Sequence, residues 1–238
     1  FGDQLVLAAI ARTKAQSYDP TTGNYNGFWV VDRDFSNRTS LVVDPPDGLI
    51  PPLTEAANDR LCAQMKYSLQ HPAGTWSDRP LSERCITYGV PFIGSGYNSY
   101  FQIFQSADHV VIEMEMIHDA RVIPLQAKPH LDDSIRQWHG DSRGWWDGDT
   151  LVIETTNYSP KSDFYGSTRN LHLTERLTLV GAHTLDYELT FDDSTTWTRP
   201  WTVSIPLKGT DEAIFEYACH EGNYGLLNIM RGARAGPK

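Results

Sequence analysis

Segment 100–221 most constrains the fold of this chain, because it is a series of short strand-like runs separated by turn residues. Run 151–155 is apolar and follows the Asp-Gly-Asp turn sequence of 147–149. Runs 171–179 and 185–191 alternate strictly between apolar and polar side chains, which predicts two half-buried strands joined as a hairpin. These signals indicate an antiparallel sheet built from successive hairpins.

The strand-like runs follow one another without intervening helical stretches, so a doubly wound parallel sheet is not expected. A meander of this length usually closes on itself, because closure removes unpaired strand edges. We therefore predict an all-β fold: an antiparallel up-and-down barrel of the lipocalin-like (calycin-like) kind, with a few peripheral helices.

The predicted domain organisation is an N-terminal helical arm over residues 1–26 and a single β-barrel domain over residues 27–238. Apolar residues at helical spacing near the start of the chain favour the arm. The prolines and glycines of 71–99 predict a long loop that wraps the barrel, and loops of this length are usually functional or flexible. Thr54 is suited to cap a helix that begins directly after it.

The charge of the chain limits the classes of partner. Twenty basic residues against 30 acidic residues give a net charge of −10, which argues against nucleic acid and against an anionic membrane surface. No apolar run approaches the ~20 residues of a transmembrane helix. We expect a small-molecule ligand or substrate, no nucleic acid and no membrane insertion, and the oligomeric state stays open. The chain has no dinucleotide-binding or P-loop motif, so no cofactor is expected.

Three cysteines, Cys62, Cys85 and Cys219, leave at least one thiol unpaired within the chain. Three reduced thiols are one alternative. The other alternative is one disulfide, either Cys62–Cys85 or Cys85–Cys219, formed in an oxidising compartment. We predict that Cys85 is oxidised and favour Cys62 as its partner, because the loop between them is short and rich in turn residues.

The densest polar group of the predicted sheet is His118, Asp119 and Arg121, where one strand ends and the next begins. Arg121 could hold a carboxylate, while His118 carries a proton and Asp119 orients it. The alternative is a hairpin corner with a surface ion pair.

A second set of candidate catalytic residues is Glu175, His220 and Glu221. Glu175 interrupts an otherwise apolar strand face, so it is either a buried acid with acid–base potential or the partner of an arginine. His220 and Glu221 end a predicted strand and could form a base and its neighbour at the barrel mouth. The alternative is a strand-to-helix junction with Glu221 near the helix N-terminus.

Five further residues are candidate ligand-binding residues: Trp138, His139, Trp197, Arg199 and Tyr224. The aromatic loop that carries Trp197 and Arg199 could cover a ligand or simply seal the core. Histidines and an aspartate also gather near 118–141, but none has the close spacing of a metal motif, so no metal site is predicted.

We predict that His118 and His220 lie at the same end of the barrel, less than about 15 Å apart, with Arg121 between or beside them. Both histidines end predicted strands, and the ends of a small barrel are where ligands bind. The alternative places the two histidines at opposite ends as structural hydrogen-bonding residues.

Several stretches resemble a family of uncharacterised, β-rich bacterial proteins that are predicted to be secreted. The resemblance spans about residues 41–235 and is carried by 117–121, 140–144, 147–157 and 217–224 among others. This chain has Gln-Ala-Lys-Pro-His at 126–130 where family members often have Asp-Gly-Arg-Pro-His, which weakens a role for that turn. The resemblance implies export, with a signal peptide presumed removed, and implies no activity.

The expected function is that of a periplasmic or extracellular enzyme that uses acid–base chemistry in a barrel cavity. Its substrate would be a small organic molecule or a sugar, handled by lyase, isomerase or hydrolase chemistry. One alternative is a non-catalytic, lipocalin-like binding protein for a hydrophobic or aromatic ligand, which needs an apolar cavity. Another is a structural or self-assembling surface protein, which needs large apolar outer patches.

Overall fold

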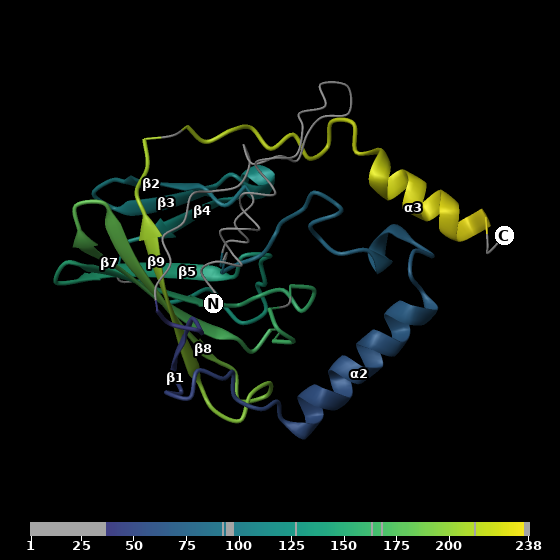
Figure 1. Ribbon diagram of the computed structural model, residues 1–238, viewed down its shortest axis with the longest axis horizontal. Helices are drawn as coiled ribbons and strands as arrows, with labels where there is room; N and C mark the ends of the chain where they lie inside the picture. Colours follow the sequence, from purple (N-terminus) through teal and green to yellow (C-terminus); the bar gives the residue numbers. More distant parts are fainter. Residues whose placement is uncertain are drawn as a thin grey trace.

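A computed structural model describes residues 37–91, 93, 98–126, 128–162, 164–167, 169–211 and 213–235. The predicted helical arm over 1–26 lies outside these residues. The described part is mostly β and forms two antiparallel sheets, which confirms the all-β, antiparallel character expected from the hairpin pattern. Figure 1 shows the two sheets together, with the helices α2 and α3 set apart from them.

The larger sheet has six strands in the order β1-β9-β8-β7-β6-β5. Its strands are β1 (Val42–Asp44), β5 (Asp141–Asp147), β6 (Thr150–Thr156), β7 (His172–Gly181), β8 (Thr184–Asp192) and β9 (Trp201–Lys208). The smaller sheet has the order β2-β3-β4 and consists of β2 (Phe101–Gln105), β3 (His109–Met114) and β4 (Ala120–Pro124). Every ladder is antiparallel.

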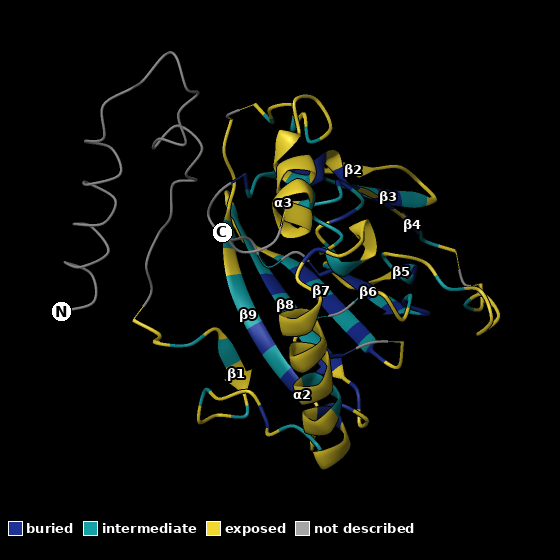
Figure 2. Ribbon diagram, turned by 90° about the vertical axis from the view of Figure 1, so that its right-hand side faces the viewer, coloured by how far each residue is buried: buried dark blue, intermediate teal, exposed yellow. Residues whose placement is uncertain are grey.

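The predicted closed barrel is not found in the described part of the chain, where β1 and β5 are the edges of the larger sheet. The smaller sheet meets the larger one through side chains: Ile123 and Leu125 approach within 3.0 Å of the space that a Cβ on Gly144 would occupy. A glycine at that point lets β4 lie close to β5 without a shared hydrogen-bond ladder. The result is two packed sheets in place of one closed barrel (Figures 1 and 2).

The β7–β8 hairpin follows the predicted alternation. Leu173, Glu175 and Leu177 on β7 are buried, while the residues between them are half-buried. On the neighbouring strand β8, Phe191 lies opposite Leu173 and Tyr187 lies opposite Leu177. Because side chains alternate along a strand, the apolar face of the hairpin faces the core and the polar face is left to solvent.

The core fills the space between the two sheets. The smaller sheet contributes Val110, Ile112 and Met114, which alternate along β3, and Ile123 of β4. At one end of the larger sheet, the ring of Phe191 stacks on those of Trp201 (4.3 Å between centroids) and Phe164 (4.8 Å), and Trp197 packs edge-on against Trp201. Aromatic stacking of this kind adds stability beyond the burial of apolar area.

The helices contribute little to this core. Helix α2 (Glu55–Gln70) begins after Thr54, whose hydroxyl caps the amide of Ala57, as predicted. Ala57 is the only buried residue of α2, and α3 (Tyr224–Ala235) has no buried residue (Figure 2). Two short 3-10 helices, η2 (Trp76–Asp78) and η3 (Met116–His118), complete the order of elements. No helix among the described residues has the length and apolar character needed to cross a lipid bilayer.

Two segments are irregular, one of them the predicted strand that leads to His220. Residues 135–139 make a single bridge at Gln137, and the described residues of 209–219 run as an extended segment outside either sheet. This extended segment returns to the loop that follows η2 and is tied there by a disulfide bond between Cys85 and Cys219. The oxidation of Cys85 is confirmed, but the favoured partner, Cys62, is wrong: it is a free, exposed thiol on α2.

Candidate functional site

The connection between β3 and β4 is a strained turn. Ile117 has φ +60° and ψ +12°, and His118 has φ +48°. Left-handed backbone is unfavourable for a residue with a Cβ and most unfavourable for a β-branched residue such as isoleucine. Such strain persists only where the surrounding structure enforces it, and strained residues often occur at functional sites. The turn brings Glu115 and His118 to one cavity and turns the side chain of Asp119 toward Thr87.

A cavity of about 530 Å³ lies between this turn and the extended segment, and we call it the His118 cavity. His118 and His220, which are 102 positions apart, both line it, so the structure brings the two predicted histidines to one cavity. The volume is within the range of about 300–1,000 Å³ typical of small-molecule sites. The lining residues are Glu113, Met114, Glu115, His118, Ile214, Phe215, Glu216, Ala218, His220 and Glu221.

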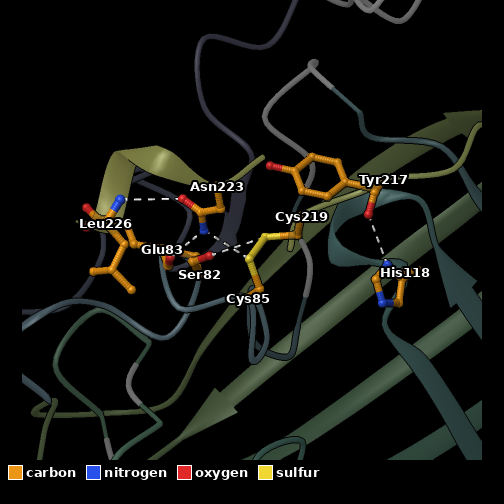
Figure 3. The surroundings of a disulfide bond; sticks show 8 residues. All are labelled: Ser82, Glu83, Cys85, His118, Tyr217, Cys219, Asn223 and Leu226. Atoms are coloured by element: carbon orange, nitrogen blue, oxygen red, sulfur yellow. Dashed lines mark hydrogen bonds between the residues drawn. A yellow bond between two sulfur atoms is a disulfide. The ribbon is translucent and has the colours of Figure 1, made fainter. Parts of the chain in front are cut away.

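The ring of His118 is held in one tautomer. Its Nδ1 lies 3.0 Å from the carbonyl oxygen of Tyr217 (Figure 3). A carbonyl oxygen can only accept a hydrogen bond, so Nδ1 carries the proton and Nε2 is unprotonated in the neutral ring. Within the described residues Nε2 makes no hydrogen bond, which leaves it able to accept a proton from a bound molecule.

The wall of the cavity opposite the turn is fixed at two points. Glu115 is 2% exposed, and its carboxylate accepts hydrogen bonds from the amide group of Asn98 at 2.6 Å and from the backbone N–H of Phe215 at 3.2 Å. The Cys85–Cys219 disulfide fixes the same segment one residue before His220 (Figure 3). These two attachments place Phe215 and His220 against the turn.

The electrostatic character of the His118 cavity is acidic. Among the described residues, four glutamates line it and no lysine or arginine does. Negative charge concentrated in a cleft attracts cations and disfavours anions. The lining therefore suits an uncharged or positively charged molecule. In the described part of the chain, no group of three or more histidine, cysteine, aspartate or glutamate side chains could hold a metal ion.

Arg121 and Glu175 are not in this cavity but form an ion pair between the sheets. The guanidinium of Arg121 donates to both carboxylate oxygens of Glu175, at 3.0 and 2.6 Å, and the Tyr187 hydroxyl also donates to Glu175. Burial on its own lowers the pKa of Arg121, but the charge of Glu175 and its hydrogen bonds outweigh this and raise the pKa. The structure thus supports the alternative in which Glu175 pairs with an arginine, and the expectation that Arg121 lies beside the two histidines is wrong.

Asp119 lies on the other side of the turn, away from the His118 cavity, and accepts a hydrogen bond from Thr87 at 2.7 Å. Trp138 and His139 line a second cavity near Thr87. The other three predicted ligand-binding residues are elsewhere. Trp197 is 1% exposed in the core, Arg199 pairs with Asp44 on the surface at 2.7 Å, and Tyr224 is exposed at the start of α3. For Trp197, the structure supports the alternative in which the aromatic loop seals the core.

From the sequence, Glu113 and Glu115 either face solvent or line a polar cavity, and the structure supports the second alternative, with Glu115 buried. The alternation of β3 places Glu113 and Glu115 on one face, but the strand ends at Met114 and η3 turns Glu115 inward. No local signal predicts this turn, because Ile117 is among the residues least expected in a left-handed conformation. Thr87 was missed because it lies in the segment 71–99, for which the sequence predicts a long loop but no role for any single residue.

Comparisons with protein-family models, with curated proteins and with solved structures give no match for this chain. The resemblance to a family of secreted bacterial proteins therefore stays a prediction. The assignment of the site depends on the geometry of the described residues.

Proposed function

We propose that this protein is an enzyme that performs acid–base chemistry on a small uncharged or positively charged organic molecule, such as a sugar or an amine, in the His118 cavity. One observation carries the proposal: His118 and His220, from distant parts of the chain, line one cavity in which the ring of His118 is fixed by the Tyr217 carbonyl. A fixed ring with an unprotonated Nε2 is suited to accept a proton in a defined direction.

The residues have distinct roles in this proposal. His118 Nε2 is the proton acceptor, and His220 on the opposite wall is the second proton carrier. The glutamates, with Glu221 beside His220, accept hydrogen bonds from hydroxyl or ammonium groups and favour positive charge. The exposed surface of Phe215 gives the ligand an apolar wall on which to pack. Removal of a proton from carbon or oxygen is a common first step of lyase, isomerase and hydrolase reactions.

The proposed location is the periplasm or the extracellular space. The Cys85–Cys219 disulfide supports it, because disulfides form and persist in oxidising compartments. The same bond holds the wall that carries His220, so the cavity depends on that environment.

The test is proton exchange with solvent. The protein is incubated in D₂O with a panel of aldoses, ketoses and amino compounds, and mass spectrometry detects one mass unit gained per exchanged C–H. We expect catalysed exchange in at least one member of the panel, and a loss of roughly 10²-fold or more in His118→Asn, as for removal of a general base. Asparagine suits this position because it tolerates positive φ and can still donate to the Tyr217 carbonyl.

The matched control is His172→Asn on β7, where the half-exposed ring lies 3.8 Å from Glu154 on the face of the sheet away from the core. This variant should exchange at the wild-type rate, whereas His220→Asn should be slower. Exchange that survives in the His118 variant would refute the proposal. Saturable binding of an amine or sugar without exchange would refute catalysis and leave a binding protein.

A further inference from the structure

The second cavity has a volume of about 500 Å³, and we call it the His139 cavity. Its lining residues are Ile86, Arg136, Gln137, Trp138, His139 and Ser159. It contrasts with the His118 cavity, because its lining, as far as the described residues form it, has an arginine and neither aspartate nor glutamate. The two cavities therefore favour ligands of opposite charge.

The hydrogen bonds of Thr87 assign the tautomer of His139. The hydroxyl oxygen of Thr87 accepts a hydrogen bond from the backbone N–H of Gly89 at 2.9 Å. It also lies 2.7 Å from a carboxylate oxygen of Asp119 and 2.7 Å from Nε2 of His139. The carboxylate can only accept, so the single hydroxyl proton goes to Asp119. The remaining contact requires His139 to donate from Nε2, which leaves Nδ1 unprotonated in the neutral ring.

This chain of hydrogen bonds is suited to hold a proton acceptor. Thr87 and Asp119 are buried, whereas the His139 side chain is partly exposed and reaches the cavity. Burial raises the pKa of Asp119, but hydrogen bonds from His139 and Thr87 outweigh it and hold the pKa below its ordinary value. The carboxylate is thus ionised, 3.4 Å from Nε2, and stabilises the imidazolium that forms when Nδ1 takes a proton.

Thr87 is not a nucleophile in this arrangement. Its proton is committed to Asp119, and its two lone pairs face the N–H groups of Gly89 and His139. Thr87 and Asp119 are therefore positioning residues for His139.

Arg136 gives the cavity its positive charge and one accessible donor. Nη1 donates to the backbone carbonyl of Arg169 at 3.0 Å. Nε is buried and has no hydrogen-bond partner among the described residues, so it does not face the cavity. Nη2, which lies 4.0 Å from the highly exposed Asp133, is left to donate to a ligand, and a carboxylate is the acceptor with which a guanidinium bonds most strongly. The exposed part of the Trp138 ring adds a surface for a planar group.

We propose that the His139 cavity is a second site, independent of the proposed function, that binds a small organic carboxylate bearing a planar group. Arg136 holds the carboxylate, Trp138 packs against the planar group, and Nδ1 of His139 accepts a hydrogen bond from a hydroxyl or N–H group where the bound molecule carries one.

The binding test uses the full chain and three matched probes: phenylacetate, phenylacetamide and phenethylamine. Calorimetric titration should detect phenylacetate, with the amide at least roughly tenfold weaker and the amine not bound in this cavity, because only the carboxylate forms a charged hydrogen bond with the guanidinium of Arg136. Arg136→Gln should weaken phenylacetate binding by roughly tenfold or more, and Arg136→Lys should weaken it less, since lysine keeps the charge. Arg176→Gln, an exposed arginine paired with Asp147 on the larger sheet, should leave binding unchanged.

The second readout separates this site from the first. The ¹⁵N chemical shifts of the His139 ring should report a proton on Nε2 in the wild type and a mixture of tautomers in Thr87→Val, while His220→Asn should bind phenylacetate like the wild type. The carboxylate site would be overturned by equal affinity for the acid and the amide. It would also be overturned if binding does not saturate at about 10 mM phenylacetate, a concentration at which even weak binding is detected. A wild-type ring protonated on Nδ1 would overturn the role of His139 as a hydrogen-bond acceptor.

Discussion

The buried ion pair between Arg121 and Glu175 makes a sharp prediction about stability. Glu175 is 0% exposed and Arg121 is 6% exposed, and the pair joins β4 of the smaller sheet to β7 of the larger sheet. Arg121 also donates to Ser142 and Thr155, each at 3.1 Å. Removal of one partner of a buried pair leaves an uncompensated charge in the core and typically lowers the unfolding free energy by about 3–5 kcal/mol. For a chain of this size that loss lowers Tm by about 6–20 °C.

The two single variants should differ in their dependence on pH. Glu175→Gln leaves a guanidinium, whose raised pKa keeps it charged throughout the range in which the protein folds, so the full loss should persist from pH 7 down to pH 5. Arg121→Met leaves a carboxylate, which can escape its buried charge by binding a proton. The loss in Arg121→Met should therefore shrink as the pH falls, because proton binding to the folded state stabilises it.

Urea unfolding of both variants at pH 7 and pH 5 measures these losses, and the double variant Arg121→Met with Glu175→Leu completes the cycle. Because neither charge remains, the double variant should be more stable than either single variant. The control is Arg176→Met, which breaks the exposed pair with Asp147 on the same strand and should cost less than about 1 kcal/mol. Losses below about 1 kcal/mol in both buried variants, or the same pH dependence in both, would refute the reasoning.

Two further predictions concern the disulfide and Asp119. The Cys85–Cys219 bond joins residues 134 positions apart, so loop closure contributes up to about 5 kcal/mol, and replacing both cysteines with serine should destabilise the fold by about 2–5 kcal/mol. Thiol titration of the unfolded, unreduced protein should find one free thiol, that of Cys62, and a count of three would contradict the bond. Because the pKa of Asp119 is lowered in the folded state, its carboxylate stabilises the fold above its ordinary pKa near 4, and this contribution is lost as the pH falls through the lowered value. The difference in unfolding free energy between the wild type and Asp119→Asn should be about 1–3 kcal/mol at pH 7 and vanish in acid. A difference that grows in acid would contradict the assignment.

Local patterns in the sequence account for the hairpins, because alternation and turn residues act within a few positions. The β7–β8 pairing, the apolar face of β3 and the Thr54 cap are all consequences of such short-range rules. Closure of the barrel is a different kind of question, because it depends on whether β4 and β5 share a ladder. That outcome depends on the packing of Ile123 and Leu125 against Gly144, which no periodicity encodes.

The disulfide shows the same limit. Loop length favours Cys62 as the partner of Cys85, since a short loop closes at a smaller entropic penalty. Helix α2, however, carries Cys62 on an exposed face, while the extended segment brings Cys219 beside Cys85 from 134 positions away. Proximity in the fold decided the pairing, and it follows from the path of the whole chain.

The candidate sites were partly predictable, because His118 and His220 end runs that the sequence predicts as strands, and both line one cavity even though only His118 follows a strand of the structure. The sequence does not predict the turn between β3 and β4, which separates the two cavities. Ile117 and His118 both adopt left-handed backbone, a strain of about 1–3 kcal/mol each, and the bonds of Glu115 and Asp119 on either side maintain it. His118 lines one cavity and Asp119 supports the other, so relaxation of this turn would alter both at once. Substitutions at His220 and Arg136, which lie outside the turn, are therefore the variants that separate the two cavities most cleanly.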